Sequence, residues 1–226
     1  MKQILLLEDD QSFGYILSEY LSMHDLSPIW AKSAEEAFEL LPRYEFKLAL
    51  LDIMLPGMDG FAFAEKLHTL YPQIPFIFIS AKALKIDQLK GYKLGAFDYI
   101  TKPIDEELLV AKVKALLAIS TKHKSQSNLS EYQIGQYSFR PDQHSLSYGD
   151  QVKTLTTREA ELLRMLAEHA NRILLRKDAL QKIWGSTDEF SRKSMDVFIS
   201  HLRKYLSADK KVSIKNIHGK GFILQC

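Results

Sequence analysis

The stretch LALLDIMLPGMDG, residues 48–60, decides the fold of the first half of this chain. Its four leading apolar residues are typical of a parallel strand that is covered on both faces, and Pro56, Gly57 and Gly60 predict a loop after it. Asp52 then stands at the carboxyl end of the strand. Ligands bind at that edge of open α/β sheets, so we expect Asp52 to belong to a functional site.

Residues 1–119 predict five repeats of a strand followed by a helix. Apolar strands are expected at 4–7, 28–31, 48–52, 75–79 and 99–101, and helical periodicity follows at 11–23, 34–41, 60–70, 86–94 and 105–119. Right-handed crossovers fold such repeats into a parallel sheet between two layers of helices. The predicted fold class is therefore α/β, a (βα)5 flavodoxin-like domain.

The pattern changes after a polar stretch at 120–132, which we interpret as a linker because it has almost nothing to bury. Residues 133–226 predict a second, α+β domain. Short strands are expected at 134–139, 144–148 and 151–155, helices from a capping box at 156–159 and at 177–184 and 191–206, and a hairpin at 213–224.

Charge is distributed unevenly along the 226 residues. Residues 1–119 hold 12 Lys and Arg against 17 Asp and Glu, whereas residues 133–226 hold 16 against 10. This suggests metal or phosphate chemistry in the first half and polyanion binding in the second. We find no signal peptide and no run that could span a bilayer, so we expect a cytoplasmic protein without a membrane partner. The single cysteine, Cys226, rules out a disulfide within one chain.

Glu8, Asp9 and Asp52 follow two predicted strands, and they converge if the strands take the flavodoxin-like order. Three carboxylates at short range repel one another, and such a group normally shares a divalent cation, with Mg²⁺ favoured by hard oxygen ligands. Ser80 and Lys102 end two further strands. They offer a hydroxyl and a positive charge to phosphoryl oxygens, which outlines a site for an acyl phosphate.

These motifs resemble the receiver domain of bacterial two-component response regulators over residues 1–119. The resemblance implies that a sensor histidine kinase phosphorylates Asp52. It also implies that Mg²⁺ is held by Asp9, Asp52, the Met54 carbonyl and, through water, Glu8. Lys102, Ser80 and the Ala81 amide would bind phosphoryl oxygens, next to a cis Lys102-Pro103 bond. Ser80 would move with Tyr99, which alters the face formed by the fourth and fifth helices.

The helix at 191–206 has an apolar side and a polar, positive side. We place Met195, Ile199, Leu202 and Leu206 on the apolar side. The opposite side holds Lys193, Ser194, Val197, Ser200, His201 and Lys204, and it could enter a DNA major groove. A solvated helix surface explains this pattern equally well. The positively charged hairpin that follows, with His218 and Lys220 near its glycines, favours DNA.

Residues 133–226 resemble the winged-helix domain of OmpR/PhoB-type regulators, on motifs that include Arg203-Lys204 and Gly219-Lys220-Gly221-Phe222. We therefore count Arg203 among the expected DNA-binding residues. In that family the third helix reads the major groove of double-stranded DNA, the wing touches the minor groove, and dimers bind direct repeats. The chain departs from the family at Ser200-His201 and at His218, where arginine is common. Histidine cannot read guanine bidentately, so the operator sequence stays open.

We therefore predict a phosphorylation-controlled transcription regulator that binds promoter DNA and is not an enzyme. We expect it to form a homodimer through the fourth and fifth helices of the receiver. That surface carries Phe97 and Leu108 at positions where the family is usually acidic, beside Lys90, Asp98 and Lys112, so we expect partial dimerisation without phosphate. One alternative is a regulator whose receiver is a constitutive dimerisation module. A second, a Mg²⁺-dependent phosphatase, is disfavoured because Met54 stands where a protonating acid would be needed.

Overall fold

The computed structural model describes residues 3–125, 131–185 and 187–226. The chain divides into two compact units, 1–126 and 127–226, which we describe separately. Within the described part of the chain, no helix has the length and apolar character needed to cross a membrane.

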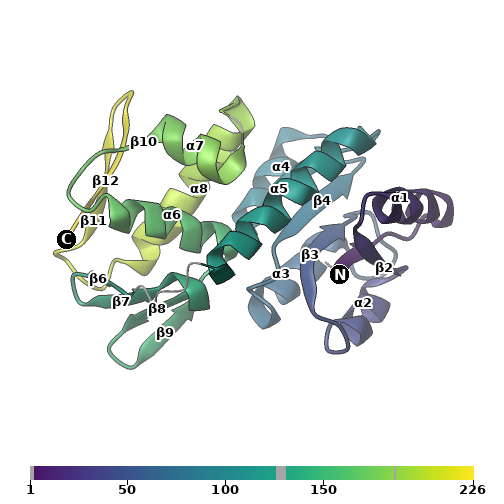
Figure 1. Cartoon of the computed structure of the whole chain (residues 1–226), viewed down its shortest axis with the longest axis horizontal. Coiled ribbons are helices and arrows are strands. Elements are labelled where there is room, and N and C mark those ends of the chain that lie inside the picture. The colour runs from purple at the N-terminus through teal and green to yellow at the C-terminus, as the bar shows by residue number, and fades with distance from the viewer. Residues whose placement is uncertain (1–2, 126–130, 186) are drawn as a thin grey trace. The chain divides into compact units, whose positions relative to one another are not determined.

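The first unit alternates strands and helices (Figure 1). All strand pairs of its sheet are parallel, in the order β2-β1-β3-β4-β5, which confirms the predicted flavodoxin-like class. The strands are β1 Gln3–Leu7, β2 Ser27–Ala31, β3 Phe46–Leu51, β4 Phe76–Ser80 and β5 Asp98–Thr101. The helices are α1 Gln11–Met23, α2 Ala34–Leu40, α3 Gly60–Leu70, α4 Lys85–Lys93 and α5 Glu106–Ser125.

Both faces of this sheet are buried, which explains the uninterrupted apolar run of β3. Leu48 and Leu50 pack with residues of α1 and α5, whereas Ala49 and Leu51 pack with residues of α2, α3 and α4. Side chains on alternate faces thus fill two separate cores, and the polar residues that follow each strand are left at the sheet edge.

Helix α5 continues to Ser125, beyond the end that we predicted at Ile119. Polar residues alone do not end a helix, and the sequence between Ser120 and Ser125 contains no proline or glycine that would stop it. Residues 126–130, the middle of the predicted linker, lie outside the described part of the chain.

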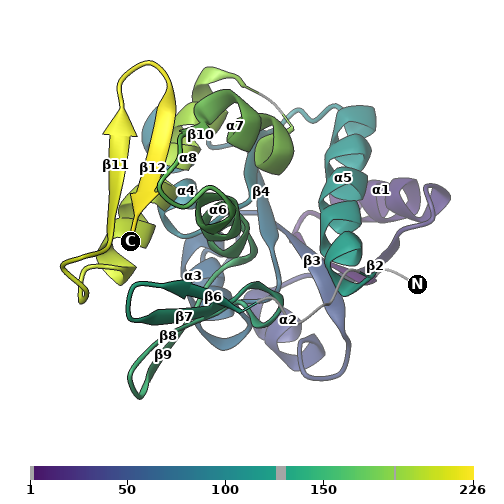
Figure 2. The same cartoon turned by 60° about the vertical axis from the view of Figure 1, so that its left-hand side comes forward.

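The second unit combines two antiparallel sheets with helices (Figure 2). One sheet has the order β6-β7-β8-β9 and the other β10-β12-β11. Its elements are β6 Tyr132–Ile134, β7 Tyr137–Arg140, η1 Pro141–Gln143, β8 Ser145–Tyr148, β9 Gln151–Thr154, α6 Thr157–Glu168, β10 Leu174–Leu175, α7 Arg176–Trp184, α8 Glu189–Tyr205, β11 Ser213–Ile217 and β12 Gly221–Gln225. The predicted α+β winged-helix architecture is confirmed.

One local prediction in this unit was wrong, and one short strand was missed. The strand expected at 134–139 is a hairpin, because Gly135 takes a positive φ of 58° and turns the chain between β6 and β7. A Cβ at this glycine would lie 2.4 Å from Val212 Cγ2, so the turn also needs the missing side chain. Strand β10 was not predicted, since its two residues are too few to show a periodicity.

Gly60 lies very close to the backbone of Asp52 and Ile53. A Cβ there would lie 1.9 Å from the Asp52 carbonyl oxygen and 2.7 Å from Ile53 Cα. We predict that Gly60→Ala lowers the free energy of unfolding of this unit by about 3 kcal/mol, because backbone atoms cannot yield as a side chain can. Urea unfolding of the full chain measures the change.

Gly57→Ala is the matched control. Nothing lies within 4 Å of a Cβ at Gly57, although its φ is +76°. Only the left-handed conformation then opposes the substitution, at a cost of about 1 kcal/mol. Equal costs for the two variants would contradict the packing argument.

Candidate functional site

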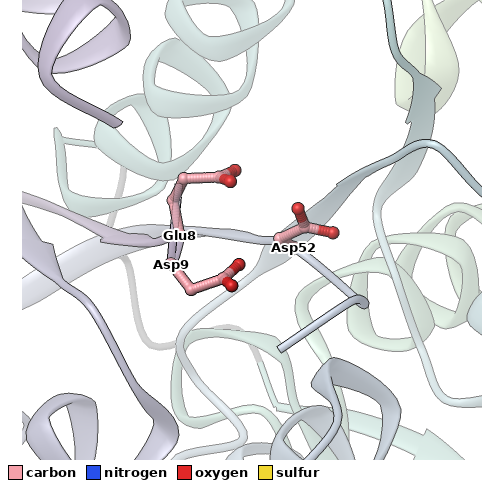
Figure 3. Close-up of side chains that lie close together, drawn as sticks. All are labelled: Glu8, Asp9 and Asp52. Atoms are coloured by element: carbon pink, nitrogen blue, oxygen red, sulfur yellow. The ribbon is translucent and has the colours of Figure 1, made fainter. Parts of the chain in front are cut away.

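The ends of β1 and β3 bring three carboxylates together at the carboxyl edge of the sheet. Glu8 and Asp9 follow β1, and Asp52 follows β3, where its N–H donates to the Leu7 carbonyl at 2.9 Å. One oxygen from each side chain lies within 4.8 Å of the others. Figure 3 shows Glu8 and Asp9 extending from one turn toward the side on which Asp52 lies. The structure therefore assembles the predicted acidic cluster of Glu8, Asp9 and Asp52.

Lys102 joins this cluster from the end of β5. Its Nζ lies 2.6 Å from Asp52 Oδ2 and 2.8 Å from Glu8 Oε2, so it bridges two of the three acids. The bond to Pro103 is cis, as expected. The ammonium also lies 4.3 Å from the ring centroid of Phe13 on α1, a cation–π contact that we did not predict from the sequence.

The other oxygen of Asp52 is held by the backbone of the loop. Asp52 Oδ1 accepts hydrogen bonds from the N–H groups of Ile53 and of Met54, the latter at 2.9 Å. The loop is fixed in turn because the Gly60 N–H donates to the Ile53 carbonyl at 3.0 Å. The Asp52 side chain, of which little is exposed, therefore has one orientation.

The cluster holds more negative than positive charge. Glu8 and Asp52 are only 2% and 5% exposed, and the Lys102 ammonium pairs with these two of the three carboxylates. Burial is the main reason that the pKa of Glu8 is raised to about 7. The Lys102 hydrogen bond lowers this pKa, and the smaller effect of the Asp52 charge raises it. Burial opposes the charged form of Lys102, but its bonds to Asp52 and Glu8 outweigh this and raise its pKa. The excess of carboxylates over ammonium groups and the available oxygen ligands fit a divalent cation.

Ser80 and Tyr99 lie beside this cluster on β4 and β5. Ser80 is fully buried, and its Oγ accepts a hydrogen bond from the Lys82 N–H at 3.3 Å. The Tyr99 hydroxyl donates to the Lys82 carbonyl at 2.7 Å. Burial, with the charges of Asp87 and Asp52, raises the pKa of Tyr99 to about 12. Both side chains thus contact the same residue, Lys82, at the start of the β4–α4 loop.

In the second unit, α8 exposes a slightly different face from the one we predicted. Ser194 is 0% exposed, and its Oγ accepts hydrogen bonds from Arg158 and from Trp184 Nε1, so placing it among the DNA-facing residues was wrong. His201 is turned toward the core as well, with Nδ1 3.0 Å from Glu159 Oε1. The cause is Phe198, a fully buried residue that widens the apolar stripe beyond the four residues we assigned to it.

The remaining predicted residues of α8 lie toward solvent. Ser200, Arg203 and Lys204 are exposed, and Lys193 and Val197 are half-buried. Arg192 and Asp196 are also exposed on this helix; we had not included them. Arg203 Nε donates to the Ile214 carbonyl of β11 at 2.9 Å, which ties the helix to the hairpin. His218 and Lys220 are exposed at the tip between β11 and β12.

Comparison with known families agrees with both halves of this description. Residues 4–114 match the response regulator receiver domain, and residues 150–224 match the C-terminal domain of transcriptional regulatory proteins. A receiver followed by such an effector defines a two-component response regulator with a DNA-binding domain.

The chain belongs to the OmpR/PhoB family of response regulators. It is 42% identical over 223 residues to the transcriptional regulatory protein RprY of Bacteroides fragilis strain YCH46, covering 98% of this chain and 94% of that protein. It is 32% identical over 232 residues to the alkaline phosphatase synthesis transcriptional regulatory protein PhoP of Bacillus subtilis strain 168, covering 99% and 97%. A solved structure of a RitR mutant is similar at a TM-score of 0.83 and 26% identity, covering 100% and 99%.

The raised pKa of Glu8 predicts an unusual pH dependence. The pKa of Glu8 is about 7 in the folded chain and 4.5 in the unfolded chain, so between these values only the folded chain keeps the proton. The free energy of unfolding of the metal-free protein therefore falls as the pH rises from 4.5 through about 7. We predict that Glu8→Gln removes this loss and raises the free energy of unfolding of the first unit by about 1 kcal/mol at pH 8, but not at pH 5. Denaturant unfolding in EDTA across this range measures the effect.

With Mg²⁺ at pH 8, the wild type should have a higher free energy of unfolding than Glu8→Gln. A bound cation stabilises the wild-type cluster more than a cluster with fewer negative charges. Glu19→Gln, a substitution on the exposed surface of α1, is the control and should leave the pH profile unchanged. A profile that Glu8→Gln does not alter would contradict the assignment.

Proposed function

We propose that Asp52 is the phosphoacceptor of this regulator and that a sensor histidine kinase is the donor. The main support is the Asp52 carboxylate itself, which the loop orients through Oδ1 while Lys102 lies 2.6 Å from Oδ2. A carboxylate attacks phosphorus poorly unless positive groups neutralise the incoming oxygens. The family membership of the chain supports the same role, and a cytoplasmic location is part of the proposal.

The transfer step conserves atoms and charge in a simple way. One Asp52 oxygen forms a bond to the phosphorus of the kinase phosphohistidine, and the phosphorus–nitrogen bond breaks. Its electron pair stays on the imidazole nitrogen, which the kinase reprotonates. Lys102 then remains as a positive partner for the phosphoryl oxygens, and Ser80 Oγ and the Ala81 N–H are the proposed hydrogen-bond donors.

Glu8, Asp9, Asp52 and the Met54 carbonyl would hold Mg²⁺, Glu8 through a water molecule. When bound, the ion supplies charge that neutralises the phosphoryl oxygens. The observed excess of carboxylates over ammonium groups supports this cofactor.

Phosphorylation would then shift an equilibrium that already exists in the receiver. We propose that Ser80 and Tyr99, which both bond to Lys82, move together and change the face of α4 and α5. A phosphoryl group that favours one receiver conformation over the other by a few kcal/mol is enough to shift the populations of the two conformations. The outcome is a dimer whose two winged helices bind promoter DNA.

Substitution of the phosphoacceptor separates this function from the constitutive alternative. We predict that a small phosphodonor with Mg²⁺ raises the DNA affinity of the wild type by about tenfold and leaves Asp52→Asn unchanged. Footprinting on the protein's own promoter region measures the affinity.

Asp25→Asn is the matched control, because Asp25 is exposed and its positive φ of 62° suits asparagine equally well. It should respond to phosphodonor as the wild type does. If wild type and Asp52→Asn bind DNA equally tightly under both conditions, the receiver is a constitutive dimerisation module instead.

The surface of α4 and α5 that we propose for dimerisation exposes apolar side chains, although only one of the two residues that we expected is among them. Phe97 is only half-exposed and packs against the core shared with α5. Leu108 is exposed as expected, and Leu84 and Ile86 are exposed as well, Ile86 by 73%. Asp98 already pairs with Lys112 of its own chain. We propose that these apolar side chains drive dimerisation in part without phosphate.

We predict that the unphosphorylated full chain sediments partly as a dimer at about 50 μM and that Ile86→Glu makes it monomeric. The charge would have to be buried without a partner at the interface. Leu70→Glu on α3, a similarly exposed position, should have no effect. A wild-type chain that is entirely monomeric at this concentration would contradict dimerisation without phosphate.

The exposed positive side chains of α8 and the wing support DNA binding by the second unit. We predict that Lys204→Ala and Lys220→Ala each weaken binding similarly on all DNA sequences and reduce the salt slope of log affinity by about 1. Lys66→Ala, on an exposed receiver helix, is the control. Salt slopes that stay at the wild-type value would show that these two lysines do not contact the DNA.

A further inference from the structure

Trp30 contacts the backbone of the acidic cluster. It lies on β2, beside β1 in the sheet, and its indole Nε1–H donates to the Glu8 carbonyl oxygen at 2.8 Å. The indole is half-buried and packs against the core that includes Leu17 and Leu21 of α1. This side chain therefore links β2 to the turn that carries Glu8 and Asp9.

The peptide that Trp30 holds is the one between those two acids. The Glu8 carbonyl belongs to the peptide unit that ends at the Asp9 nitrogen, so the orientation of this unit sets the directions in which both side chains leave the backbone. The preceding unit is also fixed, since the Glu8 N–H donates to the Ala31 carbonyl at 3.0 Å. Two neighbouring residues of β2 thus restrain Glu8 from both sides.

The indole packs closely against Gly14 on α1. A Cβ at Gly14 would lie 2.4 Å from Trp30 Cζ2 and 2.8 Å from Nε1, so the ring fits only because the helix has no side chain there. Lys32 Nζ lies 5.2 Å from the ring centroid. The indole is consequently held in one place, which a hydrogen-bond donor needs in order to position its partner.

We propose that Trp30 is a positioning residue for cation binding: its indole N–H fixes the Glu8–Asp9 peptide so that both carboxylates face Asp52. This inference rests on the proposed Mg²⁺ site and names a residue of β2 that does not touch the ion. Because outer partners of a metal site typically contribute about 10-fold or more to affinity, loss of the N–H should be measurable in binding.

Trp30→Phe tests the role of the N–H while keeping an aromatic ring against Gly14. Calorimetric titration of the full chain with Mg²⁺ should give a dissociation constant about five- to tenfold higher than that of the wild type. A residue that only packs would change the free energy of unfolding in EDTA without changing the dissociation constant. Equal dissociation constants would overturn the proposal.

Trp184→Phe provides a test that leaves the site unaltered. The chain has two tryptophans, and this variant makes Trp30 the only one. The fluorescence of Trp30 should change when Mg²⁺ is added and should saturate with the dissociation constant found by calorimetry. The reason is that the indole is hydrogen-bonded to the Glu8–Asp9 peptide, and the side chains of these two residues bind the ion. Emission that stays constant through saturation would overturn the proposal, even if Trp30→Phe does not fold.

Gly14→Ala supplies an independent perturbation, since it displaces the ring and changes no group of the cluster. It should weaken Mg²⁺ binding of the wild type, and it should have less effect in a Trp30→Val background, where the clash is relieved. Equal effects in both backgrounds would count against Trp30 as the intermediary. Failure of the wild type itself to bind Mg²⁺ would instead overturn the proposed function.

Discussion

The excess of buried negative charge at one sheet edge is the constraint on which the receiver half depends. Glu8 and Asp52 are nearly inaccessible to water, yet Lys102 is the one ammonium that bridges them. Such a cluster is costly without a cation, and the raised pKa of Glu8 expresses that cost. The same imbalance suits a divalent cation, because a cation supplies the positive charge that the cluster lacks.

Backbone contacts keep this unfavourable arrangement in place. Gly60 lets α3 begin directly against the Asp52 carbonyl, and the loop amides hold one oxygen of Asp52. Trp30 and Gly14 hold the turn on the other side. The side chains of β1, β3 and β4, most of which are buried on the two faces of the sheet, supply the stability that such a site requires. The proposed site is thus built on the ends of buried strands.

The sequence predicted those features that follow from strand ends. Parallel strands finish at one edge, so an acid after β1, an acid after β3 and a lysine after β5 had to approach each other. The side-chain orientations on α8 were harder to predict from the sequence, because four apolar positions suggested a narrow apolar stripe. In the structure, Phe198 is also buried, so the stripe is wider and Ser194 and His201 face inward. The Trp30 hydrogen bond could not be predicted, because it depends on the β1–β2 register and on one side-chain rotamer. The extension of α5 was missed because polarity was taken as a sign of a linker.

Chemical trapping of the phosphoryl group tests the central claim most directly. The full chain would be incubated with a small phosphodonor and Mg²⁺, reduced with borohydride to convert the acyl phosphate to homoserine, and sequenced by mass spectrometry. We expect homoserine at position 52 and nowhere else, and none when Mg²⁺ is replaced by EDTA. Modification at another acid, or an unmodified Asp52 in the presence of both reagents, would contradict it.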